Sequence, residues 1–525
     1  MIKNLKWLVF ASLSISLAAC SEDDSEDTAE NVPVSAGSAD FSKYVALGDS
    51  FAAGFSDNAL FKKGQENGYP NLLAQQFKLV GGGDFTLPYM NDNVGGLLFG
   101  GNPNPAFGPR IYLQGFANPT TPIIVPVAGP PSTEVFQHLT GTFSNLGVPG
   151  AKSFHLIAPG YGNPAGLGTV PASANPYFVR MASSPTTSVL ADAIAQNPTF
   201  FSLWIGGNDV LGYATNGGVP TSQDPVAGND ITPPATFEFA YNQLISQLTA
   251  GGRKGVIANL PYINTLPFFT TVPYNPIPPL PSGTPQEIQN AALLNQVLGA
   301  INQITAAAGL PPRFTRMSVS NDEGAKPNNP LLIKDESLPN LSQQIATVLT
   351  PALGAQAAGF AGNLYGQARH AQKTTQATDF ILLTTRALIG STQAGVPATF
   401  STVGVTYPLQ DNRVLTATEV AEIKVATDAY NTTIKNAAEA NGLAFVDTYA
   451  IMNQLLNGGV RFGNTHISAS FITGGAFSLD GIHPSPRGYS YIANQFLKAI
   501  DQAYGSSIPQ LNIGNYNVQY GPAIN

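Results

Sequence analysis

Short apolar runs alternate with longer amphipathic stretches along most of this 525-residue chain. Short apolar runs that stop at glycine or proline are typical of buried strands, and spaced apolar positions over ten or more residues are typical of helices. The expected strands are residues 44–47, 142–148, 200–205, 255–260 and 443–447, and the expected helices are residues 187–196, 237–249, 286–308, 416–441 and 487–504. This alternation predicts an α/β fold of βα units around a central parallel sheet.

Two long insertions interrupt the pattern, at residues 81 to about 141 and 262 to about 415. The first is rich in Gly, Pro, Asn and Phe, and the second combines a proline-rich loop with several helical stretches. Long loops without regular structure are uncommon in compact domains and often carry function. Two interpretations stay open: the insertions form a lid or pocket wall, or they only cover apolar surface.

The first residues have the pattern of an export signal. Lys3 and Lys6 precede an apolar run over residues 7–19, which is too short to span a bilayer. The run ends at Cys20, the single cysteine of the chain, in a segment that resembles the lipobox of bacterial lipoproteins. We therefore expect a signal peptide over 1–19 and lipidation of Cys20; the alternative is a secretory signal with a chance cysteine.

The acidic stretch after Cys20 predicts a lipidated linker over residues 20–42 that holds the folded domain off a membrane. Acidic runs at this place also resemble signals of surface-exported lipoproteins, and a plain spacer is the alternative. The folded domain is then expected over 43–505, with a C-terminal tail over 506–525. The chain is predicted to be an exported lipoprotein of the outer membrane, held there only by its lipid anchor.

Composition narrows the partners. The net charge is −8, and 11% of the residues are charged against 43% hydrophobic, which describes a folded, weakly charged protein. The sequence shows no cluster of Lys and Arg that could bind the phosphates of a nucleic acid, so no nucleic-acid partner is expected. The chain has no His-Glu-x-x-His, no Cys/His metal spacing and no P-loop, and we expect neither a metal nor a cofactor.

Four short segments carry candidate chemistry: residues 48–50, 145–150, 206–209 and 480–484. Ser50 follows an apolar run, so its hydroxyl is expected at a strand-to-helix turn. His483 lies three residues after Asp480 in a turn bounded by glycine and proline, where the carboxylate can orient the imidazole. The Asn208 side chain and the backbone N–H groups of Ser50 and Gly150 can stabilise an oxyanion.

Each segment taken alone has a plainer explanation. Gly-Asp-Ser often marks a turn, an Asp-Gly turn can stand beside a structural histidine, and the glycines can serve ordinary tight turns. Asn208 can cap a loop. The four segments become persuasive only as a set, because together they supply a nucleophile, a base with its orienting carboxylate, and oxyanion donors.

As a set, these segments resemble the four sequence blocks of the SGNH hydrolase superfamily, also called GDSL esterases and lipases. The resemblance implies a flavodoxin-like three-layer α/β/α sandwich. It implies Ser50 as the nucleophile, His483 as the base and then acid, and Asp480 as its orienting carboxylate. It also implies Ser50, Gly150 and Asn208 as oxyanion donors. Asp49 and Asp209 fall within the blocks, and we assign them loop-holding roles.

Two features depart from the family pattern: residues 151–153 read Ala-Lys-Ser where the family often has Asp or Thr, and the third and last blocks are unusually far apart. The expected function is hydrolysis of carboxylic esters through an acyl-enzyme, with a small molecule, lipid or acylated glycan as substrate. The alternatives are an acyltransferase that uses the same site and a non-catalytic surface lipoprotein that binds glycan or lipid.

Overall fold

A five-stranded parallel sheet lies at the centre of the protein, in a computed structural model that describes residues 33–118, 121–221, 228–321 and 327–524. Its strands are β1 (Tyr44–Gly48), β6 (Asn145–Gly147), β7 (Phe200–Trp204), β8 (Lys254–Ala258) and β13 (Ala444–Val446). Every neighbouring pair is parallel, in the order β13-β8-β7-β1-β6. The predicted parallel sheet is confirmed, although the strand expected over 142–148 has only three residues.

The strand order places the first sheet strand between the second and the third, as in doubly wound sheets of the flavodoxin type. In such sheets ligands bind outside the carboxyl ends of the strands, at the point where the winding changes direction. The registers pair Gly48 with both Gly147 and Trp204, so the ends of β6, β1 and β7 lie side by side. The loops after these three strands therefore meet at one edge of the sheet.

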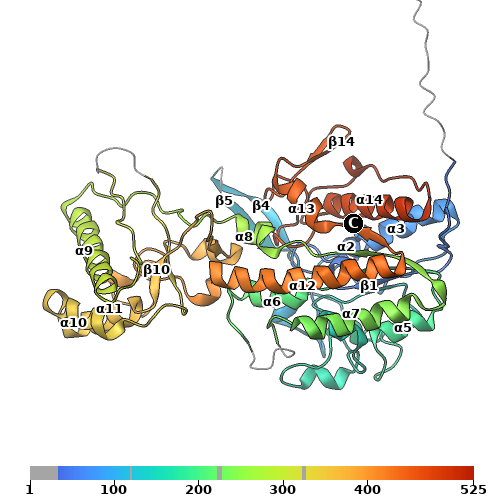
Figure 1. Cartoon of the computed structure of the whole chain (residues 1–525), viewed down its shortest axis with the longest axis horizontal. Coiled ribbons are helices and arrows are strands. Elements are labelled where there is room, and N and C mark those ends of the chain that lie inside the picture. The colour runs from blue at the N-terminus through green and yellow to red at the C-terminus, as the bar shows by residue number, and fades with distance from the viewer. Residues whose placement is uncertain (1–32, 119–120, 222–227, 322–326, 525) are drawn as a thin grey trace, which may run out of the picture. The chain divides into compact units, whose positions relative to one another are not determined.

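Helices pack in two groups around this sheet (Figure 1). One group holds α3 (Tyr69–Phe77) and α14 (Pro486–Tyr504), and the other holds α5 (Val189–Ala195), α7 (Pro234–Leu248) and α12 (Ala417–Asn441). Helix α14 contacts β13 and β8, α12 contacts β8, and α5 contacts β1. This arrangement is compatible with a three-layer α/β/α sandwich.

The helix predictions are confirmed to within three residues at either end. Helix α12 shows why the sequence was sufficient there: Thr416 and Glu419 form the capping box expected from their spacing, and Gly442 ends the helix in a left-handed conformation with φ of 59°. The further helices are α1 (Ser50–Ala53), α2 (Lys62–Asn67), α4 (Pro176–Val179), α6 (Asn208–Thr215), α8 (Pro267–Thr270), α9 (Pro285–Ala307), α10 (Ser342–Leu353), α11 (Ala355–Tyr365) and α13 (Thr448–Leu456).

Both insertions contain short strand pairs and pack against apolar surface. The strands outside the central sheet are β2 (Leu98–Phe99), β3 (Asn102–Pro103), β4 (Ile111–Asn118), β5 (Thr121–Pro126), β9 (Leu332–Lys334), β10 (Ala368–His370), β11 (Phe380–Ile381) and β12 (Val414–Leu415), and, after the second insertion, β14 (Val460–Phe462) and β15 (Thr465–Ile467). In the first insertion, Met90, Leu97 and Val135 pack in one cluster with Ala53 and Leu60 of the sheet domain. This insertion packs on apolar surface of the sheet domain.

The second insertion has a core of its own. Helices α9, α10 and α11 bury Ile301, Ile345 and Tyr365 in a cluster separate from the main core. Beside them the guanidinium of Arg369 bonds the carboxylates of Asp335 and Asp379, each at 2.6 Å. A buried cation held by two carboxylates is costly to break, so it fixes how the strands of this insertion meet.

The folded unit begins at Val34, earlier than the predicted start at residue 43. The backbone of Ser35 pairs with that of Ser507, and Ala39 and Phe41 are buried in the main core. The prediction of a solvated linker is therefore wrong for residues 34–42, because the apolar side chains near its end join the core. Residues 506–524 also pack on the domain, with Ile513 fully buried. Cys20 and the predicted signal peptide lie outside the described residues.

Candidate active site

Ser50 lies where β1 turns into α1. The Asp49 carboxylate caps this short helix by accepting a hydrogen bond from the N–H of Phe51 at 3.0 Å. Glycine is required at Gly48, because a side chain there would collide with the carbonyl oxygen of Trp204 on the next strand. The turn is therefore tight, and it places the Ser50 side chain at the carboxyl edge of the sheet, where the sequence predicted it.

Asp480 and His483 share one turn just ahead of α14. Oδ1 of Asp480 accepts hydrogen bonds from the backbone N–H groups of Ile482 and His483, each at 2.9 Å. Oδ2 lies 2.9 Å from Nδ1 of His483 and accepts from the N–H of Asn58 at 3.0 Å. Burial raises the pKa of Asp480, but the adjacent His483 and these N–H groups outweigh it and lower the pKa to about 2.

The imidazole of His483 bridges Asp480 and Ser50. Its Nε2 lies 2.8 Å from Oγ of Ser50, on the ring edge opposite the carboxylate. An ionised carboxylate only accepts hydrogen bonds, so Nδ1 carries the proton in the neutral ring and Nε2 is left as the acceptor. Nε2 can then take the proton of the Ser50 hydroxyl. The ring of His483 packs against the rings of Phe55 and Phe51, with centroids 4.7 and 5.2 Å away, and these rings restrict its rotation.

The three predicted oxyanion donors follow three neighbouring strands: Gly150 follows β6, Ser50 follows β1, and Asn208 follows β7. Gly150 has a φ of 81°, a conformation that favours glycine. One N–H of the Asn208 amide donates to the carbonyl oxygen of Ala151 at 3.0 Å, which ties the loop after β6 to the loop after β7. The second N–H of that amide has no partner among the described residues.

Asp209, after β7, links the same two loops through its bonds to Ser153, after β6. Its buried carboxylate accepts from the backbone N–H and the hydroxyl of Ser153, at 2.8 and 2.7 Å. Burial raises the pKa of Asp209 to about 6, against the effect of these bonds. Ser153 lies in the segment that departs from the family pattern, so the departure supplies both bonds that hold the loop.

Asp49 lies beside this network. A carbon atom placed on Gly207 would lie 3.5 Å from the Asp49 carboxylate, so the loop after β7 passes directly over it. Burial raises the pKa of Asp49 to about 7, and the nearby Asp209 adds to that shift. The loop-holding positions expected for both aspartates agree with the geometry, since each binds backbone N–H groups of a site loop.

Sequence reasoning missed the support behind Asp480. Asp57 and Asn58 form a turn with positive φ values of 49° and 64°, and the carboxylate of Asp57 accepts from the N–H of Leu479 at 2.9 Å. Burial raises the pKa of Asp57 to about 7, with Asp480 adding to the shift and Arg110 opposing it. An Asp-Asn pair is a turn signal, but the sequence does not say which distant loop the turn supports.

Arg110 connects this turn to the end of the described chain. Its fully buried guanidinium donates to the carbonyl oxygens of Asn93 at 2.8 Å, Gly521 at 2.8 Å and Pro522 at 3.2 Å. Nη1 of Arg110 and Oδ2 of Asp57 are buried without a hydrogen-bond partner among the described residues. Arg110 therefore joins the first insertion to residues 521–522, next to the turn of Asp57 and Asn58 that supports Asp480.

The other histidines stand in different surroundings. His138 and His466 bond backbone carbonyl oxygens, and the rings of His155 and His370 are buried, which lowers the pKa of each to about 4.

Within the described ranges, no group of three His, Cys, Asp or Glu side chains could hold a metal ion. Over the same residues, no helix has the length and apolar character needed to cross a membrane.

Comparisons of the chain with protein-family models, with curated proteins and with solved structures give no match. The assignment of a function therefore depends on the geometry of the site and on the four sequence segments.

Proposed function

We propose that this protein is a serine hydrolase of carboxylic esters, of the SGNH type, with Ser50, His483 and Asp480 as its catalytic triad. The observation that carries the proposal is the continuous chain from Ser50 Oγ through both ring nitrogens of His483 to the Asp480 carboxylate, at 2.8 and 2.9 Å. A serine hydroxyl needs an adjacent base to become a nucleophile, and this base is oriented by a third group.

The proposed reaction begins when Oγ of Ser50 attacks the ester carbonyl carbon and Nε2 of His483 takes the hydroxyl proton. The carbonyl oxygen becomes an oxyanion, which the backbone N–H groups of Ser50 and Gly150 and the amide of Asn208 stabilise. The C–O bond to the alcohol then breaks, and the alcohol leaves with the proton from His483.

In the second half, a water molecule attacks the acyl-enzyme at Ser50. Nε2 of His483 takes a proton from this water and returns it to Oγ of Ser50 when the acid is released. Asp480 stays ionised throughout, since its lowered pKa favours the carboxylate that stabilises the protonated ring. An acceptor alcohol in place of water would make the same site an acyltransferase.

Three features support the SGNH assignment. The four sequence segments carry the residue types of the family blocks, the sheet order is of the flavodoxin type, and the triad residues follow the first sheet strand and precede the last helix. Export as a lipoprotein anchored through Cys20 is proposed from the sequence alone. Labelling with a radioactive fatty acid in wild type, and its loss in Cys20→Ala, tests it.

A fluorophosphonate probe tests the proposed function directly. We expect the probe to label folded protein, with mass spectrometry locating the adduct on the peptide that carries Ser50. Denatured protein serves as the control, because an unfolded serine lacks its base. Absence of labelling in folded protein, together with no release of p-nitrophenol from p-nitrophenyl acetate, would overturn the proposal and favour the non-catalytic binding protein.

A further inference from the structure

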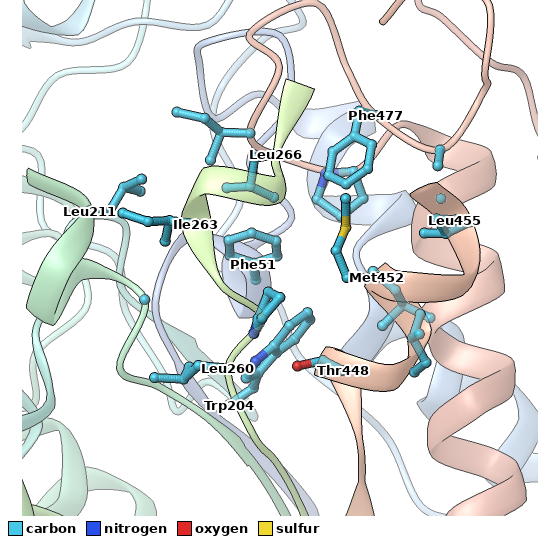
Figure 2. Close-up of a pocket in the computed structure, with 18 of the residues that line it drawn as sticks. Phe51, Trp204, Leu211, Leu260, Ile263, Leu266, Thr448, Met452, Leu455 and Phe477 are labelled. Atoms are coloured by element: carbon cyan, nitrogen blue, oxygen red, sulfur yellow. The ribbon is translucent and has the colours of Figure 1, made fainter. Parts of the chain in front are cut away.

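A narrow apolar slot opens beside the candidate active site (Figure 2). Its volume is about 80 Å³, about half that of an apolar cavity that holds one benzene ring. Its walls come mostly from aliphatic and aromatic side chains, among them Phe51, Trp204, Leu260, Met452 and Phe477. A space of this size with these walls suits one aliphatic chain better than a sugar ring or a bulky head group.

Two polar groups of the wall, the indole of Trp204 and the hydroxyl of Thr448, bond the protein. The indole N–H of Trp204 donates to the carbonyl oxygen of Asn259 at 3.1 Å, and the hydroxyl of Thr448 donates to the same oxygen at 2.5 Å. The Asn259 side chain in turn accepts from the N–H of Thr448 at 2.7 Å. These groups point into the protein and do not bond a ligand in the slot. A polar ligand buried there would lose its hydrogen bonds to water without replacement from these groups, which is unfavourable.

Four residues that line the slot are neighbours of the reacting groups in the chain. Phe51 follows Ser50 in the chain, Gly207 precedes Asn208, and Ile482 and Pro484 flank His483; all four line the slot. The ring of Phe51 also lies 5.2 Å from the ring of His483. A chain that extends from an ester carbonyl bound at Ser50 can therefore enter the slot without leaving the protein.

Two segments outside the four sequence blocks close the slot. Ile263 and Leu266, at the start of the second insertion, form one wall, and Met452 and Leu455 of α13 face it from the other side (Figure 2). The first wall is fixed to the catalytic turn, because the N–H of Phe268 donates to the carbonyl oxygen of Gly481 at 2.9 Å. This chain's own insertion thus gives the slot its width.

We propose that the slot binds a single unbranched aliphatic chain of the ester, and that its volume limits the length of chain that adds to binding. This inference depends on the proposed function for the chemistry, but the preference for chain length itself is a separate property. The chain belongs either to the acyl group or to the alcohol of the ester, and both sources share the same chemistry of recognition.

Two substrate series test the preference. The first is p-nitrophenyl esters from acetate to dodecanoate, and the second is acetate esters of linear alcohols of the same lengths. In one of them, kcat/KM should rise about fourfold for each methylene that enters the slot, up to the length that fills it, and then level off or fall. The series that shows the rise identifies the side of the ester that the slot holds.

Met452→Trp narrows the slot and provides the decisive variant. Its kcat/KM should fall at least tenfold more for the octyl substrate than for the shortest one. Leu456→Trp is the matched control, because Leu456 lies on the same helix, is 38% exposed and does not line the slot. It should keep the wild-type profile. If Met452→Trp does not fold, Met452→Ala widens the slot and should move the optimum to longer chains.

The outcomes separate the two proposals. Hydrolysis of acetate esters with a flat profile in both series overturns the slot and leaves the esterase standing. A rising profile that Met452→Trp or Met452→Ala leaves unchanged also overturns the slot. Absence of any ester hydrolysis overturns the function, and in that case binding of octanoate to wild type but not to Met452→Trp, measured by calorimetry, would still support an aliphatic site.

Discussion

The carboxyl edge of the sheet has two unlike halves. After β6, β1 and β7 the side chains are polar and held by directed hydrogen bonds, as in the pair formed by Asp209 and Ser153. Beyond β8 and β13 the edge borders the apolar slot, and the Thr448 hydroxyl turns inward to the carbonyl oxygen of Asn259. The polar half can hold and move charge, whereas the apolar half can only select shape and length.

This division makes the two halves separable by experiment. Changes in the polar half should lower turnover for every ester by a similar factor, because they act on the carbonyl carbon that all esters share. Changes in the apolar half should alter the ranking of substrates. The slot variants described above test the second statement, and the following predictions test the first.

The largest effect is expected from Ser50→Ala. Removal of the nucleophile should lower kcat by about 10⁴-fold or more, equally for acetate and octanoate esters. The measurement is initial rates at saturating substrate, with circular dichroism to establish that the variant is folded. A folded variant with the wild-type rate would contradict the assignment of the nucleophile.

Asn208→Ala should lower kcat by about 10²–10³-fold, because it removes one donor to the developing oxyanion. The factor should be the same for short and long chains, since the slot does not include Asn208. Steady-state kinetics on acetate and octanoate esters measure it. A loss confined to long chains would place Asn208 in the apolar half and break the comparison.

Asp209→Asn should have a smaller effect, a loss of about 10-fold to 100-fold in kcat with KM nearly unchanged. Asparagine keeps the shape but cannot accept both hydrogen bonds from Ser153, and a bond to a charged group is worth about 1.5–3 kcal/mol. The loop that carries Gly150 then loses its fixed position. A lower free energy of unfolding together with an unchanged kcat would mean that Asp209 only stabilises the fold.

The last prediction concerns stability rather than rate. The pKa of Asp49 is raised from 3.8 in the unfolded chain to about 7 in the fold, so folding opposes its ionisation. The free energy of unfolding should therefore fall as the pH rises from about 4 to about 7, by up to about 1.4 kcal/mol per pH unit. Asp480, whose pKa is lowered, acts in the opposite direction only below about pH 4.

Asp49→Asn tests this dependence, because asparagine can still cap α1 but carries no charge. Urea denaturation at several pH values between 4 and 7 should give a shallower decline for the variant than for wild type. The remaining slope belongs to the other carboxyls whose pKa is raised, among them Asp57 at about 7 and Asp209 at about 6. Identical slopes in the two proteins would mean that Asp49 does not titrate in this range.

The sequence predicts the polar half well because its chemistry restricts residue type. Only a few side chains can serve as nucleophile, base or oxyanion donor, so Ser50, His483 and Asn208 stand out in short segments. The strands before them are also legible, since a strand buried on both faces is apolar without interruption. The placement of Ser50 and Asn208 at one edge follows from the parallel pairing, whereas His483 reaches that edge from the turn ahead of α14.

The apolar half is not legible in the same way. Many aliphatic residues can line a slot, so Leu266 and Met452 carry no local signal, and their meeting depends on contacts between segments far apart in the chain. The role of Asn58 was missed for the same reason, because a backbone N–H looks alike at every residue. Residues 34–42 were assigned to a linker because their polar composition hid the two side chains that reach the core.

The guanidinium of Arg110 has a practical consequence for handling the protein. Residues 520–522 look expendable on the printed sequence, yet two of their carbonyl oxygens hold a cation behind the turn that supports Asp480. A protease that removes the exposed residues 521 and 522 would leave Arg110 with only the carbonyl oxygen of Asn93, at a cost of about 3 kcal/mol or more. We expect removal of residues 521 and 522 to lower the activity of the proposed hydrolase, although neither residue contacts the triad. We expect an affinity tag fused next to them to disturb the same contacts.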